Sequence, residues 1–259
     1  MIKPIFVKEK TLGDTWFQLL WDIYHHGRKT KITNGSMAGA TRLEFDFCSG
    51  ISMFPHQRPL TPIMPKGMHP VTTDEKIEEY FVDYLMEPYE INEGEHYKYA
   101  QWINKKMVNW SNSYKHHKNK AGTLDAKPEE SQLEWVIRHF REKGYGNNHC
   151  YINVGDKDSN FAYDNPWEVE TERRTSPCLR GLDFKIKDSR LITHVIYRSW
   201  DLYAGWPQNM GGFTLLNEYI AYQLPNVIPG PMAFSCAGLH CYDYQLENLK
   251  NVLHKEENS

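Results

Sequence analysis

Stretches with the apolar period of a helix and stretches typical of strands follow one another irregularly along this chain of 259 residues. Apolar side chains recur at helical spacing in residues 14–24, which predicts a helix that ends at Gly27. The alternating run over residues 42–47 predicts a half-buried strand. Because helices and strands do not alternate in regular βαβ units, the pattern favours an α+β fold.

The same patterns predict four further helices and three further strands. A capping box formed by Thr72 and Glu75 predicts that a helix begins near residue 72 and continues through Leu85. Another helix follows Pro128 and is expected to end at Gly144. The remaining helices are expected over residues 213–223 and 244–253, the strands over 150–154, 182–186 and 191–197, and loops over 50–70 and 104–127.

Composition limits the classes of protein that remain. Apolar residues make up 40% of the chain and charged residues 24%, which is enough for a core and excludes wholesale disorder. The formal net charge of −3 does not favour a protein that coats nucleic acid, so no stable nucleic-acid partner is expected. No apolar run approaches about 18 residues, so no membrane span is expected. No linker or repeat divides the chain, which predicts a single domain over residues 1–259.

The cysteines indicate a reducing compartment. They are odd in number and scattered, without the paired spacing of a zinc site, so we expect free thiols in a cytoplasm and no metal. The adjacent histidines at 25–26 and 116–117 also lack ligand spacing. The five cysteines are Cys48, Cys150, Cys178, Cys236 and Cys241.

One of these cysteines has a sequence context that suits a nucleophile. Cys178 follows Pro177 and precedes a predicted strand, with Arg173, Arg174 and Arg180 close in sequence. Nearby cations increase the thiolate population of a cysteine, and the thiolate is the reactive form. The alternative is a buried structural cysteine, which is a common place for this residue type.

Two polar features follow Cys178. Arg198 and Ser199 place a guanidinium next to a hydroxyl, which suits a phosphate, although a surface arginine at a strand end would look the same. Residues 205–209, Gly-Trp-Pro-Gln-Asn, are expected to form a rigid turn that aims Asn209 into a pocket. A side-chain amide carries both a donor and an acceptor, so it can match the edge of a pyrimidine.

Taken together, these positions resemble the thymidylate synthase family, which includes the pyrimidine-nucleotide hydroxymethylases. The spacing from Cys178 to Arg198 and to Asn209 agrees with the family without a gap. Residues 11–103 match more loosely, through the Tyr-Ala-Gln-Trp segment at 99–102. The matching motifs are Pro177-Cys178, then Arg198, Ser199, Asp201, Gly205, Pro207 and Asn209, then Gly238, His240 and Tyr242, with the glycine two places before the histidine.

The resemblance implies one-carbon transfer from 5,10-methylenetetrahydrofolate, a cosubstrate, to C5 of dUMP. Cys178 would add as a thiolate to C6 of the base, which makes C5 nucleophilic. Asn209 would hold the N3–H and O4 edge and stabilise the developing enolate. Tyr99 would assist removal of the C5 proton. Asp201 would contact the folate pterin, with Gly205 also in the folate site.

The resemblance also implies the residues that hold the rest of the nucleotide. Arg198 and Ser199 would bind the 5′-phosphate, and His240 and Tyr242 the ribose 3′-hydroxyl. The glycine-bearing turn at 33–41 lacks the family's arginine motif, so Arg42 or Arg28 is expected to take that phosphate contact.

Two expectations concern the base itself. The family has a glutamate on its second long helix that organises water near O4, and Glu79 is the candidate, with Glu78 and Asp83 as alternatives. Cytosine-using relatives often carry an aspartate where Asn209 stands. The asparagine therefore favours dUMP over dCMP.

Two products share one intermediate, an exocyclic methylene on C5: hydride gives a methyl group and water gives a hydroxymethyl group. Few residues follow Tyr242, and they read as one helix with a polar tail. We expect a wetter site and dUMP hydroxymethylation, such as a phage needs for DNA modification. Thymidylate synthase is the alternative, because short archaeal-type methylating members of the family share the Arg-Ser-Trp-Asp motif. A catalytically inactive nucleotide- or RNA-binding relative is a third reading, disfavoured by Cys178, Asp201 and Asn209 together.

The resemblance further implies the architecture. It predicts a thymidylate-synthase-like α+β domain with a large twisted mixed β-sheet flanked by helices. Two such sheets would pack face to face in a homodimer. The location would be the cytoplasm, or the host cytoplasm if the chain is phage-encoded.

Overall fold

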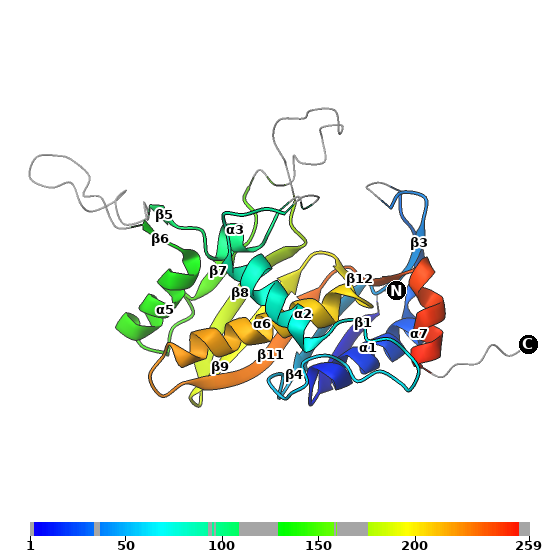
Figure 1. Cartoon of the computed structure of the whole chain (residues 1–259), viewed down its shortest axis with the longest axis horizontal. Coiled ribbons are helices and arrows are strands. Elements are labelled where there is room, and N and C mark those ends of the chain that lie inside the picture. Colours follow the sequence, from blue (N-terminus) through cyan, green and yellow to red (C-terminus); the bar gives the residue numbers. More distant parts are fainter. Residues whose placement is uncertain are drawn as a thin grey trace, which may run out of the picture.

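A six-stranded mixed sheet forms the centre of the molecule (Figure 1). The computed structural model describes residues 3–33, 37–92, 95, 97–108, 129–157, 159 and 176–253. Strands β1 and β4 run parallel, as do β11 and β9, whereas the other neighbours are antiparallel. The expected α+β class with a large mixed sheet is therefore confirmed. In sheet order the strands are β1 (Pro4–Glu9), β4 (Phe47–Ser52), β11 (Ile228–Cys236), β9 (Arg190–Tyr197), β8 (Leu179–Lys187) and β7 (Tyr151–Asn153).

A smaller four-stranded sheet lies beside the first. Its order is β10 (Trp200–Asp201), β12 (Leu239–Tyr242), β3 (Thr41–Glu44) and β2 (Arg28–Lys31). The single strand expected over residues 42–47 is wrong, because β3 ends and β4 begins within it. Between them Phe45 donates its backbone N–H to the Leu239 carbonyl, and Asp46 pairs with Arg28. The residues of the alternating pattern therefore belong to two different sheets, β3 to the smaller one and β4 to the larger one.

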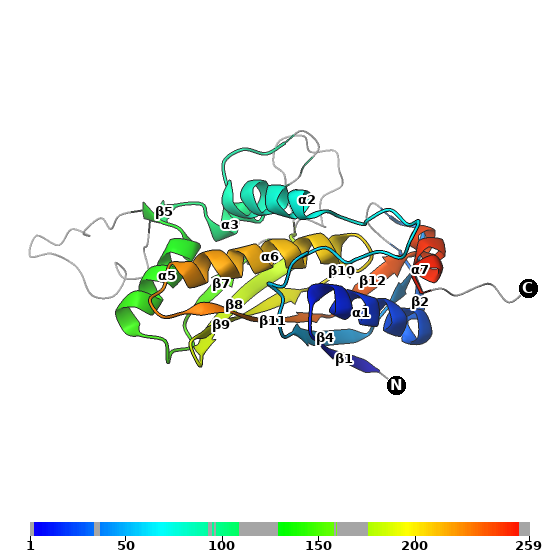
Figure 2. The ribbon, with the colours of Figure 1, turned by 60° about the horizontal axis from the view of Figure 1, so that its bottom comes forward.

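Helices α1 (Leu12–His26) and α6 (Gly205–Tyr222) cover one face of the large sheet (Figure 2). The helix expected over residues 14–24 is confirmed, with a capping box between Thr11 and Asp14 and with Gly27 at its end. Its Trp16 indole donates to the Leu202 carbonyl at 2.9 Å. This bond ties α1 to the loop that follows β10.

Helix α6 begins well before the expected start at residue 213. The rigid turn expected over residues 205–209 is wrong, because these residues form the start of the helix. Pro207 fits there, since the first N–H groups of a helix have no intrahelical acceptor. Further along, the buried Asn217 amide donates to the Leu191 carbonyl and the Thr193 hydroxyl, both at 2.8 Å. These bonds hold α6 against β9.

A second helical layer lies over α6. Helix α2 (Asp74–Glu79) continues directly into the π-helix η1 (Tyr80–Met86). The expected cap at Thr72 is wrong: Thr73 caps the helix by accepting the Lys76 N–H, and Thr72 is buried. A Cβ atom at Gly212 of α6 would lie 2.5 Å from the Tyr80 ring. Only glycine therefore lets η1 approach α6 so closely at this point.

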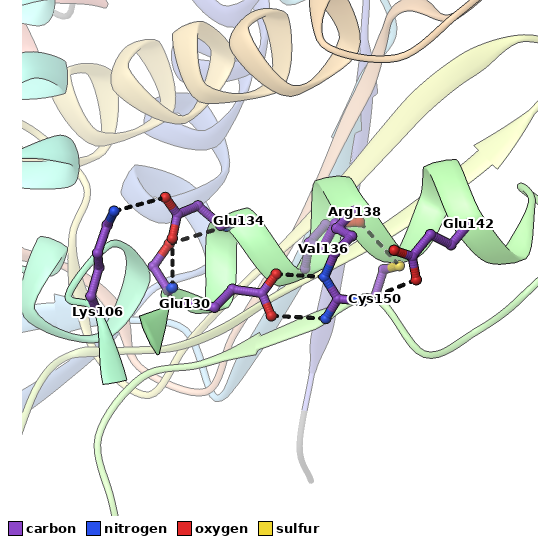
Figure 3. A network of polar contacts seen from close by, with 8 residues as sticks. Lys106, Glu130, Glu134, Val136, Arg138, Glu142 and Cys150 are labelled. Atoms are coloured by element: carbon purple, nitrogen blue, oxygen red, sulfur yellow. Dashed lines mark hydrogen bonds and ion pairs between the residues drawn. The ribbon is translucent and has the colours of Figure 1, made fainter. Parts of the chain in front are cut away.

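Helix α5 (Gln132–Lys143) lies at the β7 side of the sheet. Ser131 caps it, whereas Pro128 lies outside the described residues, and Gly144 ends it as expected. On its outer side Arg138 binds Glu130 through two hydrogen bonds of 2.6 and 2.8 Å (Figure 3). The remaining elements are α3 (Ala100–Ile103), β5 (Met107–Val108), β6 (Glu129–Glu130), η4 (Asp243–Gln245) and α7 (Leu246–Val252).

The expected strands at 150–154, 182–186 and 191–197 correspond to β7, β8 and β9. The expected loop over residues 104–127 falls largely outside the described residues. Within the described ranges, no helix is long and apolar enough to cross a membrane.

Candidate active site

Cys178 differs from the other cysteines in its exposure. It lies directly before β8 and is half-buried, whereas the other four are buried. Burial raises the pKa of Cys150 and of Cys236 to about 12, and it also raises the pKa of Cys48 and of Cys241. Among the five thiols, Cys178 is therefore the one that a ligand can reach.

Arg198 anchors the two residues that precede Cys178 in the chain. Its guanidinium donates to the Pro177 carbonyl at 3.2 Å and to the Ser176 carbonyl at 2.8 Å. Its backbone N–H also donates to the Cys178 carbonyl at 3.0 Å. The end of β9 thus positions both a cation and the segment that carries the thiol.

Tyr97, which the sequence analysis did not single out, is the tyrosine that contacts the cysteine segment. Its hydroxyl accepts the backbone N–H of Cys178 at 3.4 Å. The pKa of Tyr97 is raised to about 12, mainly by burial and to a smaller extent by the nearby Cys178. Tyr99 is buried next to Tyr97, and the centroids of the two rings are 5.7 Å apart. Burial raises the pKa of Tyr99 too. Both hydroxyls therefore stay protonated at neutral pH.

The residue between these two tyrosines anchors their segment. Lys98 is fully buried, and its ammonium lies 2.5 Å from the Asp83 carboxylate. Asp83 is half-exposed and also accepts a hydrogen bond from Asn92 at 3.1 Å. A buried ammonium needs such a partner, so this pair ties the tyrosine segment to η1.

Asn209 lies near the start of α6 and is half-buried. Its side-chain oxygen accepts a hydrogen bond from the Trp200 indole at 2.8 Å and one from the Tyr197 hydroxyl at 3.4 Å. The Tyr197 and Trp200 rings stack with centroids 3.9 Å apart and planes 7° apart. The end of strand β9 and the residues after it thus hold the amide through its oxygen.

Tyr80 brings a further hydroxyl to this amide. Its oxygen is buried and has no hydrogen bond of normal geometry within the described structure. Burial raises the pKa of Tyr80, and the nearby Asn209 and Tyr197 offset part of that rise. The sequence signal that could have found Tyr80 is the Gly-Gly pair at 211–212, which permits the close approach of η1.

The carboxylates expected near the base are arranged differently. Glu79 and Glu78 are exposed on α2, without a hydrogen bond or ion pair to any described residue. Asp83 binds Lys98 and Asn92. A water-organising role for Glu79 stays a prediction, and its placement adds no contact in support of it.

Asp201 and Gly205 lie on the other side of Asn209. Asp201 accepts the Tyr203 N–H at 3.0 Å, and the Gln245 amide donates to both of its carboxylate oxygens at 3.2 Å. A Cβ atom at Gly205 would lie 3.5 Å from Asp201 and 3.8 Å from the Asn209 oxygen. Gly205 therefore lies between these two polar side chains, and Gln245 is a buried partner that the sequence analysis missed.

The pairing of β3 with β12 brings three further expected residues together. Arg42 lies opposite Tyr242, and Glu44 lies opposite His240. Arg42 binds the Glu44 carboxylate through two hydrogen bonds of 2.9 and 3.1 Å. Arg42 and Tyr242 are thus brought together from opposite ends of the sequence.

His240 is a buried and neutral side chain. Its Nδ1 lies 2.9 Å from the Gly238 carbonyl, which can only accept, so Nδ1 carries the hydrogen. Its Nε2 is buried without a partner in the described structure, and burial is the main cause that lowers the pKa of His240. The unpaired Nε2 is therefore an acceptor that suits a hydroxyl group.

Ser199 and Arg28 are the other expected phosphate ligands. Ser199 is half-buried close to Gly238. Arg28 is largely exposed and pairs with Asp46. Arg173 and Arg174, the cations expected near Cys178, lie outside the described residues. Among the residues that the structure describes, no three His, Cys, Asp or Glu side chains are arranged to hold a metal ion.

Comparison with known proteins identifies the fold. The family model described as thymidylate synthase matches residues 98–259. The protein named "Putative thymidylate synthase" of Methanosarcina mazei is 25% identical over 249 residues, which cover 95% of this chain and 94% of that protein. A protein of the same name from Methanosarcina acetivorans is 24% identical over the same shares. The structure of thermostable thymidylate synthase A from Bacillus subtilis superposes with a TM-score of 0.59 at 15% identity, over 95% of this chain and 85% of that one.

The fold and the matching family model define a folate-dependent one-carbon transferase. The chain belongs to the thymidylate synthase family, since the family model covers more than half of it.

Proposed function

We propose that this protein transfers a one-carbon unit from 5,10-methylenetetrahydrofolate to C5 of dUMP through a covalent adduct of Cys178 at C6. The observation that supports the proposal most is the exposure of Cys178 beside Arg198 and Tyr97, in a chain whose other thiols are buried. A half-exposed thiol, on a segment that a cationic side chain holds in place, is an arrangement that suits nucleophilic catalysis.

The proposed reaction starts at the base. The Cys178 sulfur forms a bond to C6, and the electron pair of the C5–C6 double bond moves toward O4 as an enolate. The Asn209 amide nitrogen donates to O4 and stabilises that charge. C5 then carries the nucleophilic electron pair. The folate supplies carbon at the oxidation level of formaldehyde.

The C5 proton must leave before the product forms. Tyr97 and Tyr99 stay protonated at neutral pH because burial raises the pKa of both side chains, so they orient a water molecule rather than take the proton outright. C5 would bond to the methylene carbon of the folate, after which loss of the C5 proton to water and cleavage of the carbon–nitrogen bond release tetrahydrofolate and leave a methylene group on C5. Water then adds to this methylene group, and the sulfur–C6 bond breaks to release the product and the Cys178 thiolate.

The remaining expected residues fit the rest of the two substrates. Arg198, Ser199 and Arg42 supply donors for the 5′-phosphate, and the free Nε2 of His240 accepts the ribose hydroxyl, with Tyr242 next to it. Asp201 is a half-buried carboxylate, which suits the N–H donors of a pterin.

The product we propose is 5-hydroxymethyl-dUMP. Cys178, Asn209 and Asp201 are all half-exposed, so water can reach the C5 methylene group. Such a product serves DNA modification. Reductive methylation to dTMP is the second candidate, and the names of the curated relatives favour it.

We also propose that two copies associate through the large sheet. The face opposite α6 carries a hollow of about 360 Å³, lined by Phe6, Ile51 and Ile192 among others. Phe6 is 69% exposed, which is unusual for a phenylalanine on a strand and favours a covered surface. Sedimentation of wild type and of Ile192→Asp tests this proposal: a monomeric wild type would overturn it.

The activity is tested by incubating the protein with dUMP and 5,10-methylenetetrahydrofolate. A nucleotide heavier by CH₂O, with tetrahydrofolate released, means hydroxymethylation. A nucleotide heavier by CH₂, with dihydrofolate released, means methylation. Tight dUMP binding without turnover would overturn the proposal and support a binding protein.

Matched cysteine variants test the covalent step. Cys178→Ala is expected to lower turnover by at least about a thousandfold while dUMP still binds. Cys150→Ala is the control, because that thiol is buried under α5 and contacts the Val136 carbonyl. Turnover by Cys178→Ala at the wild-type rate would exclude the covalent mechanism.

A further inference from the structure

We infer that Trp200 is a positioning residue that determines which pyrimidine the site accepts, by locking the orientation of the Asn209 amide. This inference rests on the proposed function, in which Asn209 faces the base. It adds a specificity determinant behind that residue, in the layer formed by Trp200 and Tyr197.

The direction of the amide follows from the chemistry of its partner. An indole N–H can only donate a hydrogen bond. The Asn209 atom at 2.8 Å from the Trp200 nitrogen must therefore be the carbonyl oxygen. The Tyr197 hydroxyl donates to that same oxygen at 3.4 Å. A rotated amide would set two donors against each other at this short distance.

The lock is rigid because its parts are buried and stacked. Trp200 and Tyr197 are each 3% exposed, and their rings stack almost parallel. Trp200 also packs edge-on against Phe234 of β11, with centroids 6.3 Å apart. The indole cannot turn away without disturbing this packing, so its N–H stays aimed at Asn209.

With the amide orientation fixed in this way, its nitrogen faces the substituent at C4 of the base, and its oxygen lies on the side of N3. Uracil carries an oxygen there, which accepts from that nitrogen. Cytosine carries an amino group, which also donates. The lock therefore favours dUMP, and an amide freed from Trp200 could rotate and present its oxygen to cytosine.

The test is the binding preference of Trp200→Phe. Dissociation constants for dUMP and dCMP are measured by calorimetry on the full chain without folate. We expect the preference for dUMP to fall about tenfold, the effect of one short hydrogen bond. Tyr197→Phe keeps the ring and removes only the longer hydrogen bond, so its effect is expected to be smaller.

Trp206→Phe is the matched control. Trp206 is buried in the same cluster, 6.1 Å from Trp200, but its indole nitrogen has no hydrogen-bond partner in the described structure. It should lose a similar packing volume and keep the nucleotide preference. A purely structural role for Trp200 would weaken both nucleotides equally.

The outcomes separate this inference from the proposed function. Wild type that prefers dUMP, with an unchanged ratio in Trp200→Phe, would refute the lock and leave the proposed function standing. Wild type that binds neither nucleotide would refute both. If Trp200→Phe does not fold, a preference lowered in Tyr197→Phe supports the lock, and an unchanged one overturns it.

Discussion

The two ends of the candidate site are built on different principles. At the end proposed for the base, Asn209 is a neutral amide whose oxygen already accepts from Trp200 and Tyr197. At the end proposed for the phosphate, Arg42 is bound to Glu44 and the Arg198 guanidinium to backbone carbonyls. Both ends are hydrogen-bonded before any ligand arrives, but only at the phosphate end must a ligand compete with a carboxylate.

This difference follows from what each group can do with its remaining donors. The Asn209 amide nitrogen stays available after its oxygen is committed, so the base end is organised in advance. The Arg198 guanidinium donates to two backbone carbonyls, which carry no formal charge. Arg42 gives two donors to one carboxylate, which a phosphate would have to share or displace.

The largest difference is expected between the two arginines. Arg198→Ala should lower kcat/KM for dUMP about a hundredfold, because it removes both a phosphate donor and the anchor of the Cys178 segment. Arg42→Ala should cost about tenfold or less and mainly raise KM. Steady-state kinetics of both variants checks the order, and a larger loss in Arg42→Ala would reverse the comparison.

The base end depends on the close approach of η1 to α6. Gly212→Ala should lower the free energy of unfolding by about 1–3 kcal/mol, because the added methyl group would meet the Tyr80 ring. Gly146→Ala is the control, since no atom lies within 4 Å of its added Cβ. Urea unfolding measures both, and equal stability of the two variants would contradict this account of the packing.

Removing the competing carboxylate sharpens the comparison at the phosphate end. Glu44→Gln is expected to tighten dUMP binding by up to about fivefold, because a partly exposed ion pair holds Arg42 by about 0.2–1 kcal/mol. Calorimetric titration with dUMP measures the change. Weaker binding by this variant would mean that Glu44 positions Arg42 for the ligand.

The smallest effect concerns His240, whose lowered pKa keeps it neutral in the fold. As pH falls below about 6.5, the unfolded chain takes up a proton that the buried side chain resists. Stability that is present above this pH is therefore lost as pH falls toward the lowered pKa. Between about pH 7.5 and pH 5.5, the urea midpoint of wild type should fall more than that of His240→Gln. Burial also lowers the pKa of His139 and of His194, and both remain in the variant, so equal losses would contradict the assignment to His240.

The elements that could be predicted are those with local signals at both ends. Helices α1 and α5 each combine a capping box, an apolar face and a terminal glycine, and both lie where expected. Strand β11 was missed because Pro229, Gly230 and Pro231 interrupt its pattern, yet it lies in the middle of the sheet. Its pairing with β4 and β9 depends on residues far away in sequence.

The site divides in the same way. Cys178, Arg198, Asp201 and Asn209 could be found because their spacing in one stretch of sequence is itself a signal. Tyr97 lies one layer closer to Cys178 than Tyr99, although both tyrosines flank Lys98 and look alike in sequence. Gln245 carries no motif, and the only sequence signal for Tyr80 is the distant Gly-Gly pair at 211–212, so the role of each depends on the partners that it meets in the fold.

By itself, the sequence determined the class of fold, and it indicated the cysteine that we propose as the nucleophile and the polar residues that follow it, because periodicity and motif spacing are properties of neighbouring residues. The tertiary structure alone decided which way the Asn209 amide faces, which tyrosine contacts Cys178, and which arginine a carboxylate already holds. Those outcomes depend on hydrogen bonds and packing between elements that lie far apart in the chain, and no local pattern encodes them.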